Sequence, residues 1–122
     1  MKLDIQLDAD RVAAGQELTG HVLMLEGGPA RSLTLTVSFC ERSPGYLSVP
    51  FSRSSVVCEG DLATGQTVEF RYEMPDWAPP GVKGKHGELF WELEAVSDEP
   101  GLDTRARRVF EVTASLDRSY PG

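Results

Sequence analysis

Apolar residues alternate with polar ones along most of this chain, and this two-residue period constrains the fold more than any other feature. The clearest case is the segment 32–39, whose apolar members are Leu33, Leu35, Val37 and Phe39. Successive side chains of a β-strand point to opposite faces, so this segment predicts a strand with one buried and one solvated face. No long window shows the 3.6-residue period of a helix. The sequence therefore indicates an all-β protein.

Turn residues divide this pattern into seven or eight predicted strands. The predicted strands are residues 3–8, 17–25, 32–39, 56–59, 68–74, 89–95 and 104–114, with residues 46–55 as an irregular edge or a mobile loop. Residues 75–87 are rich in proline and glycine and predict a crossover without regular structure. We expect the tail Ser119–Gly122 to be frayed. Short strands with frequent turns predict an immunoglobulin-like antiparallel β-sandwich.

The composition limits the kind of partner that this chain can bind. Its 122 residues predict a single domain spanning 1–122, and the formal net charge of −7 disfavours binding to nucleic acid or to anionic membranes. No apolar run approaches the length of a membrane span. The first residues lead directly into a strand pattern without a signal region, so we expect a cytoplasmic protein.

The two cysteines, Cys40 and Cys58, allow two interpretations. They flank the segment 41–57, and a hairpin with its turn at the midpoint of that segment would place them opposite each other. A cross-strand disulfide is then conceivable. We favour two buried free thiols, since disulfides are rare in the cytoplasm.

Four segments occur in the same order as in a known family. They are Gly15 with residues 18–22 (LTGHV), residues 70–75 (FRYEMP), residues 78–80 (APP) with 84–87 (GKHG) and 89–95 (LFWELEA), and residues 107–112 (RRVFEV). Together these segments resemble the turns and strand ends of arrestin N-terminal domains. The family includes visual, beta- and alpha-arrestins, retromer-type sorting subunits and a bacterial sporulation-control protein.

The resemblance implies an arrestin-type β-sandwich and a non-enzymatic protein-interaction or scaffold module. The family's members are built from two such sandwiches, and this chain has the length of one. It also has no Pro-Pro-x-Tyr motif of the kind that alpha-arrestins use to recruit ubiquitin ligases. What carries over is the fold and the expectation of a protein partner of unknown identity.

Residues suited to catalysis are few. Nucleophilic catalysis needs a serine or cysteine beside a histidine that a carboxylate orients. Cys58 with His86 is the one pair that merits a test, and an inert thiol with a surface histidine is the interpretation we favour. Asp4, Asp8 and Asp10 lack the tight glycine-containing loop of a calcium site. We therefore expect no enzyme activity, no metal and no cofactor.

Aromatic residues in loops are the candidate contacts for a protein partner. The candidate partner-binding residues are Trp77 and His86 in the crossover, Tyr46 and Phe51 in the irregular segment, and Phe90, the apolar exception on an acidic strand face. The alternative for Trp77 is that it packs back on the end of the sandwich, and the sequence leaves both open.

Two further hypotheses concern how the domain is used. A homo-oligomer through a sheet edge is plausible, because a single sandwich must otherwise protect its edges. The alternative function is an immunoglobulin-like structural domain of a secreted or surface protein, which a disulfide between the two cysteines would favour.

Opposite charges are expected on the solvent face of the last two predicted strands. Glu92 and Glu94 alternate with core residues on one strand, and Arg105 and Arg107 follow on the next. Such cross-strand pairs contribute a few tenths of a kcal/mol each. Arg108 shares the parity of the core residue Phe110, so an inward orientation is conceivable.

Overall fold

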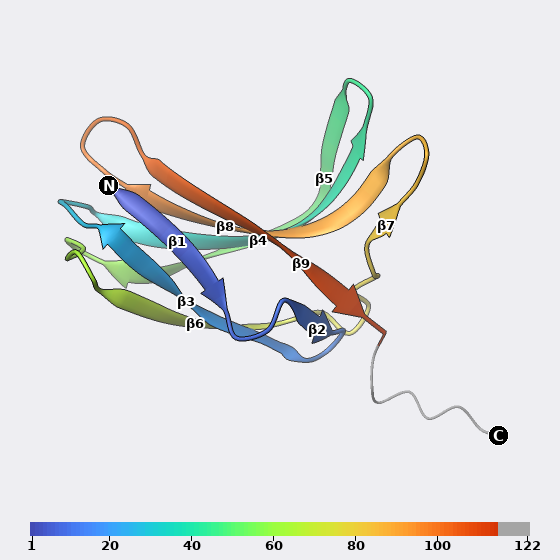
Figure 1. Ribbon diagram of the computed structural model, residues 1–122, viewed down its shortest axis with the longest axis horizontal. Helices are drawn as coiled ribbons and strands as arrows, with labels where there is room; N and C mark the ends of the chain where they lie inside the picture. The colour runs from blue at the N-terminus through green and yellow to red at the C-terminus, as the bar shows by residue number, and fades with distance from the viewer. Residues whose placement is uncertain (115–122) are drawn as a thin grey trace.

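The computed structural model describes residues 1–114, which form a β-sandwich of nine strands (Figure 1). The strands are β1 Lys2–Leu7, β2 Arg11–Ala13, β3 Glu17–Glu26, β4 Ser32–Ser43, β5 Tyr46–Glu59, β6 Thr67–Glu73, β7 Val82–Lys83, β8 Glu88–Asp98 and β9 Thr104–Thr113. Across these residues no helix is long and apolar enough to cross a membrane. The tail that we expected to be frayed, Ser119–Gly122, lies outside the described residues.

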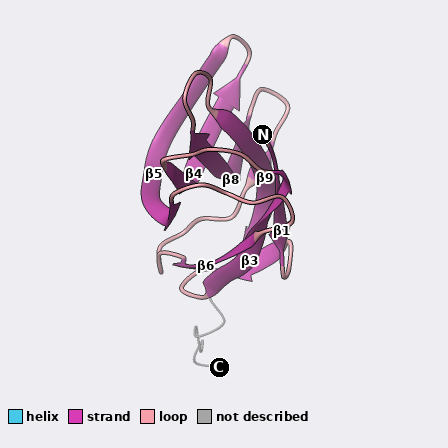
Figure 2. Ribbon diagram, turned by 90° about the vertical axis from the view of Figure 1, so that its left-hand side faces the viewer, coloured by secondary structure: helices cyan, strands magenta, loops and turns pink. Residues whose placement is uncertain are grey.

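The strands form two sheets of unequal size. A three-stranded sheet has the order β1-β3-β6, and a six-stranded sheet has the order β2-β9-β8-β4-β5, with β7 paired to β8. Figure 2 shows the small sheet packed across one face of the large one. All pairs are antiparallel except β2 with β9, which run parallel. This confirms the sandwich, with one parallel pair that the sequence did not predict.

The prediction of seven or eight strands was too low because two strands are very short. β2 and β7 contain three and two residues, too few to show any period. Both exist because a long neighbour offers backbone groups for pairing: Val12 lies opposite Val112 of β9, and Val82 lies opposite Leu89 of β8. The crossover 75–87 is therefore not wholly irregular.

The segment expected to be irregular is part of the longest strand. Residues 46–55 and the short strand predicted at 56–59 form one continuous strand, β5, antiparallel to β4. Pro50 lies at a register shift between the pairs Phe39–Phe51 and Glu41–Ser48. An edge strand tolerates proline at such a bulge. Proline has no backbone N–H, and the bulged residue needs none because it does not pair with β4. The pattern of β5 was hard to interpret because residues 52–56 are all exposed.

The apolar face predicted for each long strand is buried. Leu33, Leu35 and Val37 of β4 pack in the core with the corresponding residues of β3, β6, β8 and β9. Trp91 of β8 is fully buried, and its indole N–H donates to the carbonyl of Pro79 at 2.8 Å. Because a buried indole needs an acceptor, this bond fixes the crossover against the core.

The cysteines do not lie opposite each other, because the β4–β5 hairpin turns earlier than its midpoint. Ser43 pairs with Tyr46, and this turn places Cys58 opposite Leu33. Cys40 is then about 24 Å further along β4, at the rise of a strand. Both cysteines are free thiols, as we favoured, but only Cys40 is buried and Cys58 is half-buried.

The predicted charge pairs form between β8 and β9. Arg107 Nε lies 2.7 Å from a carboxylate oxygen of Glu94, and Arg105 Nη1 lies 3.2 Å from the other. Arg108 lies opposite Leu93 on the inner face of the large sheet, as its parity predicted, but it is not buried in the core. Its side chain is exposed, and its guanidinium donates to the carbonyl of Ile5 at 3.4 Å, which links β9 to the edge strand β1.

Candidate functional site

The five residues predicted to contact a partner do not form one cluster. Trp77 and Phe51 pack against each other beside the end of β6. Tyr46 and His86 lie at the β4–β5 turn and the β7–β8 loop, which project side by side from one end of the large sheet (Figure 1). Phe90 is buried, with 8% of its surface exposed. The structure therefore offers two separate candidate surfaces.

Trp77 and Phe51 form what we call the aromatic notch. Their ring centroids are 5.0 Å apart and the rings are nearly perpendicular, at 87°. This edge-to-face arrangement is a favoured one for two aromatic rings. The Phe51 ring also lies beside the buried Trp91, with 5.9 Å between the two ring centroids, so the notch is continuous with the core. Even so, 60% of Trp77 is exposed, so this residue both packs on the sandwich and presents a surface to solvent.

Backbone hydrogen bonds hold the loop that carries Trp77. The carbonyl of Pro75 accepts from the N–H groups of Gly15 and Ala78, at 3.2 and 3.1 Å. Gly15 has φ of +79°, and a Cβ there would lie 2.7 Å from Oδ1 of Asp76, so glycine permits the close approach of the two loops. The indole of Trp77 thus projects from a fixed backbone.

A shallow cavity of about 280 Å³ opens beside the two rings. It is lined by Phe51, Arg53, Glu73, Met74, Pro75, Asp76 and Trp77. The lining is mainly polar, with the cation Arg53 facing the acids Glu73 and Asp76, and the exposed ring of Trp77 supplies the apolar surface beside it. Sequence reasoning missed Arg53, because it treated this part of β5 as irregular.

Tyr72 of β6 is a second residue near the notch that the sequence did not single out. Its hydroxyl is buried and has no hydrogen-bond partner within residues 1–114. Burial raises the pKa of the Tyr72 phenol, and the positive charge of Arg53 opposes that shift. Arg53 therefore lies close enough to Tyr72 to influence its ionisation.

The surface between the two projecting loops is basic. A hollow of about 430 Å³ lies between residues 42–45 and 83–88, and it includes Lys83, Lys85 and His86. Arg42 forms an ion pair there, with 3.1 Å between its Nη1 and Oε1 of Glu88. Its guanidinium carbon lies 4.7 Å from the centroid of the Phe90 ring. This contact covers Phe90, which explains why an apolar side chain on an acidic strand face is buried.

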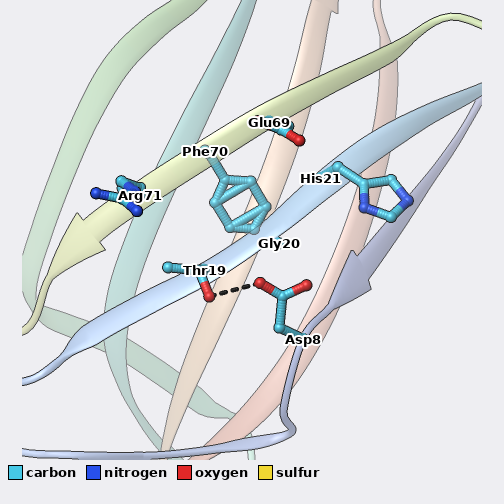
Figure 3. Close-up of a pocket in the computed structure, with 7 residues that line it drawn as sticks. All are labelled: Asp8, Thr19, Gly20, His21, Glu69, Phe70 and Arg71. Atoms are coloured by element: carbon cyan, nitrogen blue, oxygen red, sulfur yellow. Dashed lines mark hydrogen bonds between the residues drawn. The ribbon is translucent and has the colours of Figure 1, made fainter.

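A polar hollow of about 490 Å³ lies on the small sheet. Figure 3 shows Asp8, Thr19 and His21 around it, with the Phe70 ring at its centre. Asp8 accepts a hydrogen bond from Thr19 at 2.6 Å, and His21 Nε2 lies 2.8 Å from the Gln6 amide oxygen. The acid and the imidazole are each engaged with a neutral partner, so they do not form an orienting pair for catalysis.

The one catalytic pair that the sequence offered does not form. Cys58 lies opposite Leu33 at one end of β4, and His86 lies in the loop that flanks Arg42 at its other end. These positions are about 30 Å apart along the strand. Nor does any group of three histidine, cysteine, aspartate or glutamate side chains within residues 1–114 gather as a metal site requires.

Comparison with solved structures identifies the fold family of this sandwich. Spo0M, a sporulation control protein from Bacillus subtilis, has a crystal structure that superposes on this chain with a TM-score of 0.68 at 18% sequence identity. The match covers 91% of this chain and 48% of that one. The chain has an arrestin-like fold. It spans about half the length of that solved structure.

Sequence comparison adds nothing to this assignment: no family model and no curated protein matches the chain. At 18% identity the structural match establishes the arrestin-like fold alone. The motifs that suggested the fold take part in forming it: Gly15 and Pro75 join two loops of the arrestin-like sandwich, and Trp91 anchors the crossover.

Proposed function

We propose that this arrestin-like domain is a non-enzymatic protein-interaction module, and that it binds its partner through the aromatic notch. The observation that carries the proposal is the position of Trp77: its ring is 60% exposed, yet it is held edge-on to Phe51 on a hydrogen-bonded loop. A large aromatic side chain that is exposed and already ordered binds with little loss of entropy.

The chemistry of the notch indicates the kind of contact. The exposed ring of Trp77 offers an apolar contact, and Arg53, Glu73 and Asp76 beside it offer one positive and two negative charges. Tryptophan and arginine are the residue types that most often dominate the energy of protein interfaces. The partner therefore presents an apolar anchor flanked by polar groups.

A reducing compartment fits the cysteines, and we place the domain in the cytoplasm. The register of the β4–β5 hairpin keeps Cys40 and Cys58 too far apart for a disulfide with each other. The alternative of an immunoglobulin-like surface domain drew its support from that disulfide, so no observation favours it.

Affinity purification from the native host tests the proposal. The bait is the full chain, compared with Trp77→Ala and with Leu102→Ala as a matched control. Leu102 lies in the β8–β9 turn and is 93% exposed, so its truncation removes an apolar surface elsewhere. Truncating an aromatic anchor costs about 2 kcal/mol or more, or roughly thirtyfold in affinity.

The expected result is a partner that the wild type and Leu102→Ala retain and that Trp77→Ala loses. Circular dichroism of each bait shows that the sandwich is intact. Calorimetry with the purified partner then measures the loss. Equal retention of every partner by folded Trp77→Ala would refute the role of the notch.

A further inference from the structure

The free edge of β5 is a second surface, which adjoins the aromatic notch at Phe51 and Arg53. β5 pairs with β4 on one side and is the last strand of the six-stranded sheet. Figure 2 shows it as the outermost strand on its side of the sandwich. Every second residue of such a strand directs its backbone N–H and C=O groups away from the sheet, where they are available to another strand.

β5 lacks the charges that usually protect a sheet edge. Between Tyr46 and Cys58 the only charged residue is Arg53. The terminal strand of the small sheet on the same side, β6, is seven residues long and carries three charges, at Glu69, Arg71 and Glu73. Charged side chains on an edge oppose pairing with another chain. Of these two edges, β5 is the one that is open to association.

The exposure of β5 follows from the unequal sheets. Five consecutive residues, 52–56, are exposed, so in this stretch neither face of β5 is covered. Nearby side chains are apolar as well: Val56 is 56% exposed, Val49 is 50% and Leu47 is 61%. On the solvent face, small hydroxyl side chains lie beside the edge, and Thr36 of β4 bonds to Ser54 at 2.7 Å between the two oxygens. This face is smooth enough for a second strand to lie alongside.

We propose that two copies of this chain associate through β5, antiparallel about a two-fold axis at Ser54. In that register Phe51 lies opposite Val57 of the second copy, Ser52 opposite Val56, and Arg53 opposite Ser55. An aromatic residue then meets a β-branched one, and the single cation does not meet itself directly. The sequence of β5 is thus compatible with its own antiparallel copy.

Net charge also favours a second copy at this edge over the other edges. The chain carries −7, so two copies repel each other wherever their acidic surfaces meet. β5 brings no carboxylate into the paired stretch 50–58. The regular part of β5 between its two register shifts, residues 51–56, is about 20 Å long, and pairing there joins two six-stranded sheets into one.

Charge reversal across the two-fold axis tests the proposal with the full chain. Sedimentation velocity is measured for the wild type from about 10 to 200 µM, a range that covers micromolar affinity. Ser52→Lys/Ser54→Lys and Ser52→Glu/Ser54→Glu each place like charges opposite one another and are expected to weaken self-association by about tenfold. An equimolar mixture of the two variants is expected to restore the dimer.

The matched control is Thr67→Lys/Glu69→Gln on β6, which changes the net charge by the same amount as the lysine variant and is expected to dimerise like the wild type. A wild type that stays monomeric through this range overturns the proposal, and an extended segment of another protein would then be the occupant to seek. Dimers that persist in both β5 variants, or a mixture that fails to restore them, also overturn it. Circular dichroism confirms that each variant is folded. Because Trp77→Ala leaves Ser52–Ser55 unchanged, loss of the notch is not expected to affect this result.

Discussion

Removing a single oxygen from Tyr72 is expected to stabilise this domain. The hydroxyl is buried without a hydrogen-bond partner among residues 1–114, while its ring packs against the core. A buried polar group without a partner costs about 1–3 kcal/mol, so Tyr72→Phe is expected to raise the free energy of unfolding by about 1 kcal/mol. The phenylalanine ring fills the same space, and no cavity forms to offset the gain.

Alkaline pH gives the same substitution a second, independent readout. Burial raises the pKa of Tyr72 in the folded state, so the folded protein holds this proton more tightly than the unfolded chain. The stability that depends on this proton is complete below the unfolded pKa near 10 and is lost as the pH rises above that value. Tyr72→Phe does not have this loss, and its advantage over the wild type is expected to grow above pH 10.

Urea denaturation at pH 7 and at several alkaline pH values measures both effects. Tyr46→Phe is the matched control, because Tyr46 is 57% exposed and loss of its hydroxyl is expected to change stability by less than about 0.5 kcal/mol. A Tyr72→Phe protein that is less stable than the wild type at pH 7 would refute the reasoning, since it would show that the hydroxyl makes a favourable bond.

Three further substitutions test the core and the thiols. Trp91→Phe is expected to lower the free energy of unfolding by about 2–3 kcal/mol, because it opens a cavity and leaves the carbonyl of Pro79 without its donor. Chemical denaturation measures this change, and an unchanged midpoint would contradict it. In thiol labelling followed by absorbance, Cys40 is expected to react more slowly than Cys58, because burial, with Glu92 nearby, raises the pKa of Cys40. The Cys40→Ala and Cys58→Ala variants separate the two rates, and faster labelling of Cys40 would be the contrary result.

The long strands could be predicted from the sequence because one of their faces is buried. In β4 the alternation holds over residues 32–39 and in β8 over residues 91–98, where the inner face is covered and the outer one is more exposed to water. β5 breaks this rule: with Ser52 to Val56 exposed throughout, no selection for apolar residues on one face produces a pattern. The two shortest strands were missed for a different reason, because their existence depends on the partner strand and not on their own residues.

The candidate site was only partly accessible to sequence reasoning. Trp77 could be predicted because a large aromatic in a loop rich in proline is conspicuous, and Phe51 because it lay in an aromatic segment. That these two pack together could not be predicted, because it depends on the register of the β4–β5 hairpin and on where the crossover ends. Arg53 and Tyr72 gave no signal at all, since their proximity is produced by two edge strands from different sheets.

Both proposed surfaces follow from one property of the sandwich, the different sizes of its sheets. A three-stranded sheet cannot cover the inner face of a six-stranded one, so part of the larger sheet must be covered by loops or remain open. At Phe51 the crossover closes that face with Trp77, and this produces the aromatic notch. Further along the same strand, Ser52 to Val56 stay exposed and form the free edge, with Arg53 shared between the two surfaces. A larger small sheet would therefore be expected to cover both surfaces. By contrast, Trp77→Ala changes the aromatic notch, and Ser52→Lys/Ser54→Lys changes the free edge of β5.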